Sequence, residues 1–347
     1  MKEIKDEKVS LMLSKVGVAI VGVGFVGGQA HVPSFKKIAG SELVALCART
    51  EKRVKPLSEK YNVRYCLDYD KLLEDPRVQA VMVAVPTPSH FDTAMKAIKK
   101  GKHVLCEMPM APTIDEVKEL QKAAKEMGVI LMPVLQYRFA PIYVKTKEMI
   151  KSNAIGRPIA FDFREFIPAT DLAKQWPMGS WAWDIGKSGG YPDFTFSVWS
   201  IDLIRWMFEC EVDSVDWMGN YPKFEKYGGI LGYNTMGLTK LSDGIVGSIH
   251  YSGSVTPSAG TVRFEVYGDN TNVLHAISYN KILLYGPSLE PQELNLDVKG
   301  TRVWGHRQLD EHFVDCILHN QRPQVTAEDA IRAQEIAQRI TANIKQK

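Results

Sequence analysis

The chain has 347 residues, of which 45% are hydrophobic and 24% are charged, and these values are close to those of soluble globular proteins. This composition excludes a disordered chain, a collagen-like repeat and a disulfide scaffold, and the length predicts two domains. Lys and Arg outnumber Asp and Glu by 43 to 40, so the net charge of +3 gives no support for a nucleic-acid or anionic-membrane partner.

The cysteines and the N-terminal tail indicate no export signal. The five cysteines are scattered and form no CxxC pair, which fits a reducing compartment. Residues 1–15 are charged and contain an apolar run of only three residues, too short for a signal peptide or a spanning helix. We therefore expect a cytoplasmic protein without a membrane partner, with a tail that is disordered or packs on a neighbour.

From Val16 the sequence alternates short β-branched runs with helical periods, which predicts βαβ units and a parallel sheet over residues 16–136. Thr113 and Glu116 form a capping box before one of the helices, and Gly128 is a candidate C-cap at its end. The expected strands lie at about residues 16–22, 42–48, 64–66, 78–86, 102–107 and 129–136.

Residues 137–347 have a different pattern, which predicts a second, antiparallel-rich α/β domain. One strand is expected to place Asp162, Arg164 and Phe166 on one face and Phe161, Phe163 and Glu165 on the other. Further strands are expected at about 237–242, 244–253 and 261–268, and helices at about 194–209, 309–318 and 327–344. The last helices can pack back on the first domain.

A glycine motif follows the first expected strand. Gly22, Gly24 and Gly27 form GxGxxG between a strand and a helix, the context that a dinucleotide site requires. The first glycine permits a tight turn, the second lets the backbone approach a diphosphate, and the third allows close packing of helix on strand. Exposed N–H groups and the helix end then hold the diphosphate, with Phe25 and Val26 inside the same turn.

The residues after the second strand decide between NAD and NADP. An NAD site usually has an acidic residue about twenty positions after the glycines, but this chain has Ala48, Arg49 and Thr50. Arg49 and the Thr50 hydroxyl can bind a 2′-phosphate through charge-assisted hydrogen bonds, whereas Arg49 is otherwise an ordinary surface residue. The sequence favours NADP over NAD as the cofactor.

Five segments together resemble the Gfo/Idh/MocA oxidoreductases, the family of glucose-fructose oxidoreductase and inositol dehydrogenase. The segments are GVGFVGGQAHVPSF, DYDKLLEDPRVQAVMVAVPTPSH, GKHVLCEMPMAPT, QYRFAPIY and SGGYPDFTFSVWSIDLIRW. The resemblance covers nearly all of the chain after Val16. It implies a doubly wound Rossmann domain, a second α/β domain with a large, mostly antiparallel open sheet, a homodimer or homotetramer formed through that sheet, and hydride exchange with a sugar, polyol or related alcohol.

The resemblance also implies roles for single residues. Glu107 and Met108 would lie beside the nicotinamide, and Pro86, Thr87 and His90 would shape the cofactor pocket, although His90 can also be a helix cap and Glu107 an ion-pair partner.

Three positions depart from the family pattern. The usual Glu-Lys-Pro is Glu107, Met108, Pro109 here, and the usual Asp and His before Asp202 are Thr195 and Trp199. Met, Thr and Trp cannot exchange the hydroxyl proton that alcohol oxidation releases. Three hypotheses remain: an oxidoreductase with other acid–base groups, a redox-neutral glycosidase-like enzyme, and a non-catalytic sensor that binds NAD(P) and a ligand.

Other groups can fill the missing role. Lys187 can donate a proton if buried, or can be a solvated loop residue. Asp193 can enter the substrate site or cap the next helix. Tyr137 and Arg138 follow the sixth strand where ligands bind, and Arg138 either contacts substrate or braces the site.

The remaining candidate contacts are aromatic. Trp183 and Trp199 can stack on a sugar ring or pack in the core, and Met108 and Thr195 complete the expected substrate set. The histidines show no metal-ligand spacing, so no metal is expected.

Overall fold

The computed structural model describes residues 15–188 and 192–345. The chain folds into two compact units. The first comprises the chain up to Glu107, Glu119–Val134 and Arg307–Thr326, and the second comprises Met108–Lys118, Leu135–His306 and the chain from Ala327 onward.

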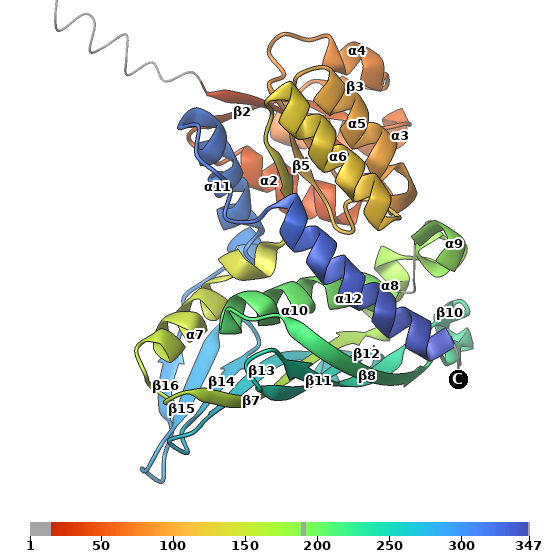
Figure 1. Cartoon of the computed structure of the whole chain (residues 1–347). Helices are drawn as coiled ribbons and strands as arrows, with labels where there is room; N and C mark the ends of the chain where they lie inside the picture. Colours follow the sequence, from red (N-terminus) through yellow and green to blue (C-terminus); the bar gives the residue numbers. More distant parts are fainter. Residues whose placement is uncertain (1–14, 189–191, 346–347) are drawn as a thin grey trace, which may run out of the picture. The chain divides into compact units, whose positions relative to one another are not determined.

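The first unit is built on a six-stranded parallel sheet with the order β3-β2-β1-β4-β5-β6 (Figure 1). Its central strands are continuous apolar runs because helices cover both faces, so β1 and β4 are buried at every residue. The strands are β1 (Val16–Val21), β2 (Ser41–Cys47), β3 (Tyr65–Cys66), β4 (Ala80–Val83), β5 (His103–Cys106) and β6 (Leu131–Pro133). The expected Rossmann-type doubly wound sheet is confirmed.

Helix α6 (Ile114–Met127) begins and ends where local signals predict. Thr113 and Glu116 form the capping box, with the Glu116 amide donating to Thr113 Oγ1 at 3.2 Å and the Thr113 amide donating to Glu116 Oε2 at 2.9 Å. Gly128 ends the same helix with φ +65°. The elements are the π-helical turn η1 (Gly27–His31), α2 (Val32–Phe35), α3 (Glu51–Tyr61), α4 (Tyr69–Leu73), η2 (Thr87–Ser89), α5 (His90–Lys99), α6 (Ile114–Met127) and α11 (His306–Leu318).

The second unit is built on an eight-stranded sheet with the order β16-β15-β14-β13-β7-β12-β11-β8. Only the β7–β12 pair in this order is parallel, so the expected mostly antiparallel sheet is confirmed. The strands are β7 (Pro158–Pro168), β8 (Val212–Asn220), β11 (Asn234–Leu241), β12 (Val246–Val255), β13 (Thr261–Gly268), β14 (Val273–Ile277), β15 (Lys281–Tyr285) and β16 (Gln292–Asn295), with a separate pair β9 (Lys223–Phe224) and β10 (Ile230–Leu231).

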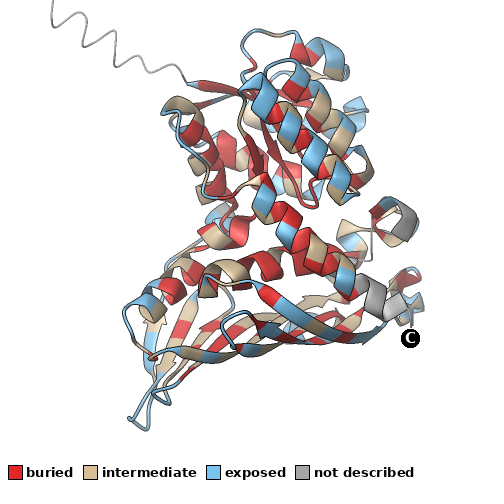
Figure 2. Ribbon diagram, in the orientation of Figure 1, coloured by how far each residue is buried: buried red, intermediate tan, exposed pale blue. Residues whose placement is uncertain are grey.

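Helices α7, α10 and α12 lie along one face of this sheet (Figure 1), and that side holds the core of the unit (Figure 2). The sequence pattern predicts α10 and α12 but not α7. The helical elements are η3 (Gln136–Phe139), α7 (Pro141–Lys151), α8 (Ala169–Gln175), η4 (Trp181–Trp183), α9 (Ile185–Ser188), α10 (Pro192–Phe208), η5 (Glu225–Tyr227), η6 (Pro257–Ala259), η7 (Gly300–Arg302) and α12 (Ala327–Lys345).

Strand β7 shows how the sequence pattern divides the sheet into two faces. Phe161, Phe163 and Glu165 are buried, and Asp162 and Arg164 are only partly so, which confirms the predicted alternation. An acidic residue, Glu165, therefore lies on the apolar face.

The opposite face carries exposed apolar side chains at the β8–β11–β12 end of the sheet. Met218, Met236, Leu238 and Val246 are each more than half exposed, and Met218 pairs directly with Met236 across β8 and β11.

In the described part of the chain, no helix combines the length and the apolar character needed to cross a membrane.

Candidate active site

The glycine turn after β1 has the geometry of a diphosphate cradle. Gly22 has φ +94°, and a Cβ added there would lie 2.3 Å from the carbonyl oxygen of Ala84. A Cβ at Gly27 would lie 2.1 Å from the Gly22 oxygen, so both positions require glycine for packing. At Gly24, by contrast, a Cβ would meet no described atom within 4 Å. The Gly24 backbone is therefore open on the side from which a diphosphate would approach.

The helix that follows this turn begins with the π-helical segment η1. The Gly28 amide donates to the Gly24 carbonyl at 2.9 Å, which closes the turn. Phe25 is 44% exposed beside it, an unusual position for a large apolar side chain, and Val26 is half-buried. Phe25 therefore offers an apolar surface next to the cradle.

The residues expected to select the adenosine ribose lie at the end of β2. Ala48 is half-buried, whereas Arg49 and Thr50 are exposed. Thr50 occupies the N-cap position of α3 in extended conformation, without a side-chain capping bond. Its hydroxyl and the Arg49 side chain thus face solvent just beyond the strand.

The segment after β4 is held by His90. This side chain is 2% exposed, and its Nε2 donates to the Val85 carbonyl at 2.7 Å. Thr87 is also buried, in the single turn η2 that begins after Pro86. His90 therefore fixes the backbone between β4 and α5 through this bond.

Glu107 follows β5 and belongs to a buried ion cluster that sequence reasoning missed. His31, which is fully buried, lies 3.1 Å from Glu107 Oε1 through Nε2 and 2.9 Å from Asp310 Oδ1 through Nδ1. Burial by itself lowers the pKa of His31, but the Asp310 and Glu107 carboxylates outweigh it and raise the pKa to about 10. His31 is therefore an imidazolium between two acids.

In the second unit, α10 carries the positions where the family pattern expects acid–base residues. Thr195 and Trp199 are four residues apart and therefore share one helix face, with Thr195 buried and Trp199 half-buried. Asp202 is 1% exposed one turn further along.

Arg138 contacts that aspartate. Its Nε donates to Asp202 Oδ2 at 2.8 Å, and its Nη2 donates to Asp329 Oδ1 at 2.8 Å. Burial lowers the pKa of Arg138, yet the two carboxylates outweigh this effect, so the guanidinium stays charged. Arg138 therefore connects η3 to α10 and α12 through ion pairs. This arrangement matches the bracing role, one of the two roles expected for Arg138.

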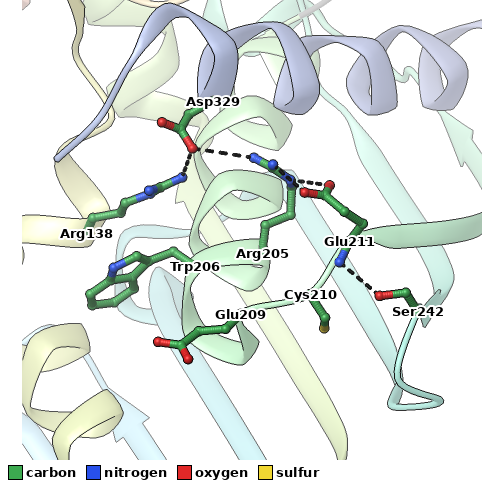
Figure 3. A pocket seen from close by; sticks show the side chains of 8 residues that line it. All are labelled: Arg138, Arg205, Trp206, Glu209, Cys210, Glu211, Ser242 and Asp329. Atoms are coloured by element: carbon green, nitrogen blue, oxygen red, sulfur yellow. Dashed lines mark hydrogen bonds and ion pairs between the residues drawn. The ribbon is translucent and has the colours of Figure 1, made fainter. Parts of the chain in front are cut away.

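A pocket of about 380 Å³ opens beside this network (Figure 3). Arg205 reaches Asp329 from one side and Glu211 from the other, where its Nε donates to Oε2 at 2.7 Å. Glu211 in turn accepts a side-chain bond from Arg205 and donates its amide to Ser242 at 3.1 Å. Most of the charged side chains that line this pocket therefore form ion pairs with other residues of its lining.

Tyr137 lies on the other side of η3. Its hydroxyl donates to Glu165 Oε1 at 2.7 Å and is 3.3 Å from the Tyr279 hydroxyl. Its ring centroid is 6.2 Å from that of Trp199. Tyr137 is thus next to one vacated family position, and it joins a buried carboxylate that motif reasoning did not single out.

The remaining sequence candidates are Lys187, Asp193, Trp183 and Met108. Lys187 lies in the short helix α9, is 63% exposed and pairs with Asp184 at 2.7 Å, so it is a solvated surface residue. Asp193 falls in the first turn of α10, but its side chain lies outside the described residues. Trp183 is half-buried, with its Nε1 donating to the Trp176 carbonyl at 2.7 Å. Met108 is buried.

Comparisons with known proteins match both units. Family models match residues 16–134 to an oxidoreductase family with an NAD-binding Rossmann fold, and residues 147–347 to the C-terminal α/β domain of that family, Gfo/Idh/MocA. A scyllo-inositol 2-dehydrogenase (NAD(+)) of Bacillus subtilis is 25% identical over 328 residues, covering 92% of this chain and 91% of that protein.

Solved structures share the fold. GenD2 from gentamicin A biosynthesis, crystallised with NAD, has a TM-score of 0.79 at 22% identity, covering 96% of this chain and 94% of its own. The biliverdin reductase of Synechocystis sp. PCC 6803, crystallised with biliverdin and NADP+, has a TM-score of 0.78 at 20% identity, covering 95% of this chain and 99% of its own.

Proposed function

Because the chain belongs to the Gfo/Idh/MocA family of NAD-binding oxidoreductases, we propose that it transfers hydride between a nicotinamide dinucleotide and a sugar, polyol or related alcohol or ketone. The observation that carries the proposal is the Gly22–Gly27 turn, where two glycines are required for packing and Gly24 alone is left open. The Bacillus subtilis relative, which matches over nearly its whole length, is named for the oxidation of an inositol.

The first unit supplies the groups for the cofactor. Backbone amides of the glycine turn would hold the diphosphate, and Phe25 would pack against the dinucleotide. Arg49 and Thr50 would bind a 2′-phosphate, so NADP is the favoured form. Glu107 is held as the partner of an imidazolium at the carboxyl end of β5, the edge of the sheet where such folds bind ligands.

The second unit supplies the groups for the substrate. When bound, the nicotinamide accepts or donates the hydride; the protein must orient the alcohol and exchange its hydroxyl proton. Met108, Trp183, Thr195 and Trp199 are the proposed substrate contacts. Tyr137 is the proposed acid–base group because it is buried, bears a hydroxyl and already donates to a carboxylate.

We also propose that the chain assembles into a homodimer or homotetramer through the open face of the eight-stranded sheet. Met218, Met236, Leu238 and Val246 expose apolar surface together on adjacent strands of that face. Burying such a patch against a second copy is the usual reason for its presence.

The test combines calorimetric titration with NADP and NAD and a panel of polyols followed at the nicotinamide absorbance. We expect binding of at least one nucleotide, a tighter constant for NADP, and turnover of at least one polyol. Arg49→Asp should reverse the NADP preference, with Lys52→Asp as a nearby surface control. Nucleotide binding without turnover would indicate a sensor, and product formation without net NADPH change would indicate a redox-neutral enzyme.

A further inference from the structure

The vacated acid–base positions leave the chain without the usual proton acceptor, but a buried carboxyl lies beside them. We propose that Glu165 is the positioning residue that makes Tyr137 a proton relay, taking over the part that Lys, Asp and His play in the family pattern. This inference rests on the proposed oxidoreductase function and deepens it.

Glu165 occupies a position that packing alone does not explain. It lies on the helix-covered face of β7, in line with Phe161 and Phe163, and is only 4% exposed. Burying a carboxyl in such surroundings costs free energy unless it is hydrogen-bonded. Glu165 Oε1 accepts from Tyr137, whereas Oε2 is buried without a hydrogen-bond partner. An apolar residue of similar size would fill this site at lower cost.

In the part of the chain that the structure describes, the titratable groups shown around Glu165 are tyrosines. Tyr137 comes from η3, Tyr143 from α7, Tyr251 from β12 as the register partner of Glu165, and Tyr279 from the turn between β14 and β15. Burial raises the pKa of Glu165 to about 7, and the hydrogen bond from Tyr137 lowers it only in part. The carboxyl can therefore take up or release a proton at neutral pH.

The backbone at Ser278 and Tyr279 has positive φ angles, a conformation that costs conformational free energy for residues other than glycine. Ser278 and Tyr279 have φ +49° and +65°, although hairpin turns of this kind strongly favour Asn-Gly. A left-handed conformation is unfavourable for a bulky residue and persists where the surroundings enforce it. Here it brings the Tyr279 hydroxyl to 3.3 Å from that of Tyr137.

The proton path then balances. In alcohol oxidation, the C–H bond breaks with its electron pair and the hydride reduces the nicotinamide, while the alcohol carbon becomes a carbonyl. The substrate O–H bond breaks, and its proton joins Tyr137 Oη as the phenolic proton moves to Glu165 Oε1. Carbonyl reduction runs the same path backward, from a protonated Glu165.

The position of Tyr137 next to Trp199 connects the proton path to the substrate residues proposed on α10. The Tyr137 ring contacts that of Trp199, the residue that replaces the family histidine on α10. A relay through Tyr137 therefore delivers its proton beside the position that the histidine would occupy.

The experiment compares Glu165→Gln with Tyr143→Phe, a matched control in the same cluster whose hydroxyl is buried without a hydrogen-bond partner. We expect Glu165→Gln to lower kcat for polyol oxidation by about 10²- to 10⁴-fold and to remove the rise in rate through pH 7. Tyr143→Phe should keep both. An equal loss at every pH would overturn the relay, because it would mark a purely structural role.

A second readout needs no cofactor. Infrared titration of the protein alone should show a buried carboxyl that protonates near pH 7 and is absent in Glu165→Gln. Tyr137→Phe should move that midpoint upward, because it removes the hydrogen bond that favours the carboxylate. An unmoved midpoint, or no such carboxyl, overturns the relay while polyol turnover still supports the proposed function. If neither nucleotide binds, the proposed function itself fails.

Discussion

Replacing His31 with glutamine tests the buried ion cluster of the first unit. The imidazolium lies between Asp310 and Glu107, and glutamine would remove the cation that both buried carboxylates contact. Removing one partner from a buried ion pair costs about 3–5 kcal/mol. The rise of the His31 pKa from 6.5 to about 10 corresponds to about 5 kcal/mol, in agreement with that range. For a domain of this size, the melting temperature should fall by roughly 6–20 °C.

The pH dependence gives the sharper result. Below pH 6.5 His31 is protonated in the folded and unfolded states, so its contribution to stability is complete. Above pH 6.5 only the folded state keeps the proton, and the contribution falls by about 1.4 kcal/mol per pH unit until about pH 10. Between pH 6.5 and 8.5 the wild type should therefore lose about 3 kcal/mol from this group, and His31→Gln should lack that slope.

His103 provides the matched control. It is half-buried, accepts from the Ile130 amide, and has a pKa lowered by burial, so its contribution changes only below pH 6.5. The assay is urea unfolding of wild type, His31→Gln and His103→Gln at several pH values. Parallel slopes for wild type and His31→Gln between pH 6.5 and 8.5 would refute the imidazolium, as would a loss below about 1 kcal/mol.

Three further predictions concern single positions. Gly24→Val should keep the melting temperature, because the valine side chain would point into open space. Calorimetry should show nucleotide binding weakened about 100-fold, equivalent to about 3 kcal/mol. Unchanged affinity would mean that the diphosphate binds elsewhere. Arg138→Met should destabilise the protein by about 3–5 kcal/mol in urea unfolding, because it removes the guanidinium that hydrogen-bonds the buried Asp202 carboxylate and leaves Arg205, at 3.9 Å, beside it. Asp202→Asn in the same background should restore part of the loss, and no recovery would contradict the pairing. Leu238→Lys should shift the mass measured by light scattering toward the monomer, because this side chain is 67% exposed on the open sheet face; an unchanged assembly would exclude that face.

The sequence predicts those parts of the fold that follow from local patterns. GxGxxG between a strand and a helix locates the cradle, and the period-2 pattern of β7 assigns Glu165 to the buried face. Helix ends at Thr113 and Gly128 follow from side-chain and backbone chemistry within a few residues. Helix α7 escapes prediction because its apolar residues fall into two short groups separated by lysines and a glutamate, which weakens the helical period.

The clusters that matter for chemistry are not local. His31 and Asp310 are 279 residues apart, and they meet because the chain returns to the first unit as α11 after completing the second sheet. Tyr137 and Glu165 are 28 residues apart, and Tyr279 joins them through a hairpin turn. The signal that could have been used was chemical: an acid on an apolar strand face needs a donor, and tyrosine is the natural one in an aromatic core.

Two buried glutamates in this chain show how environment separates roles that residue type leaves equal. Glu107 lies 3.1 Å from the His31 imidazolium, as the partner of an ion pair in the unit that carries the cofactor cradle. Glu165 lies among tyrosines in the described part of the chain, and burial raises its pKa to about 7 in the unit that carries the substrate candidates. Acid–base assignments follow where environments differ in this way. A carboxyl with a pKa near 7 can both accept and release a proton at neutral pH, so the surroundings of Glu165 suit it to proton exchange.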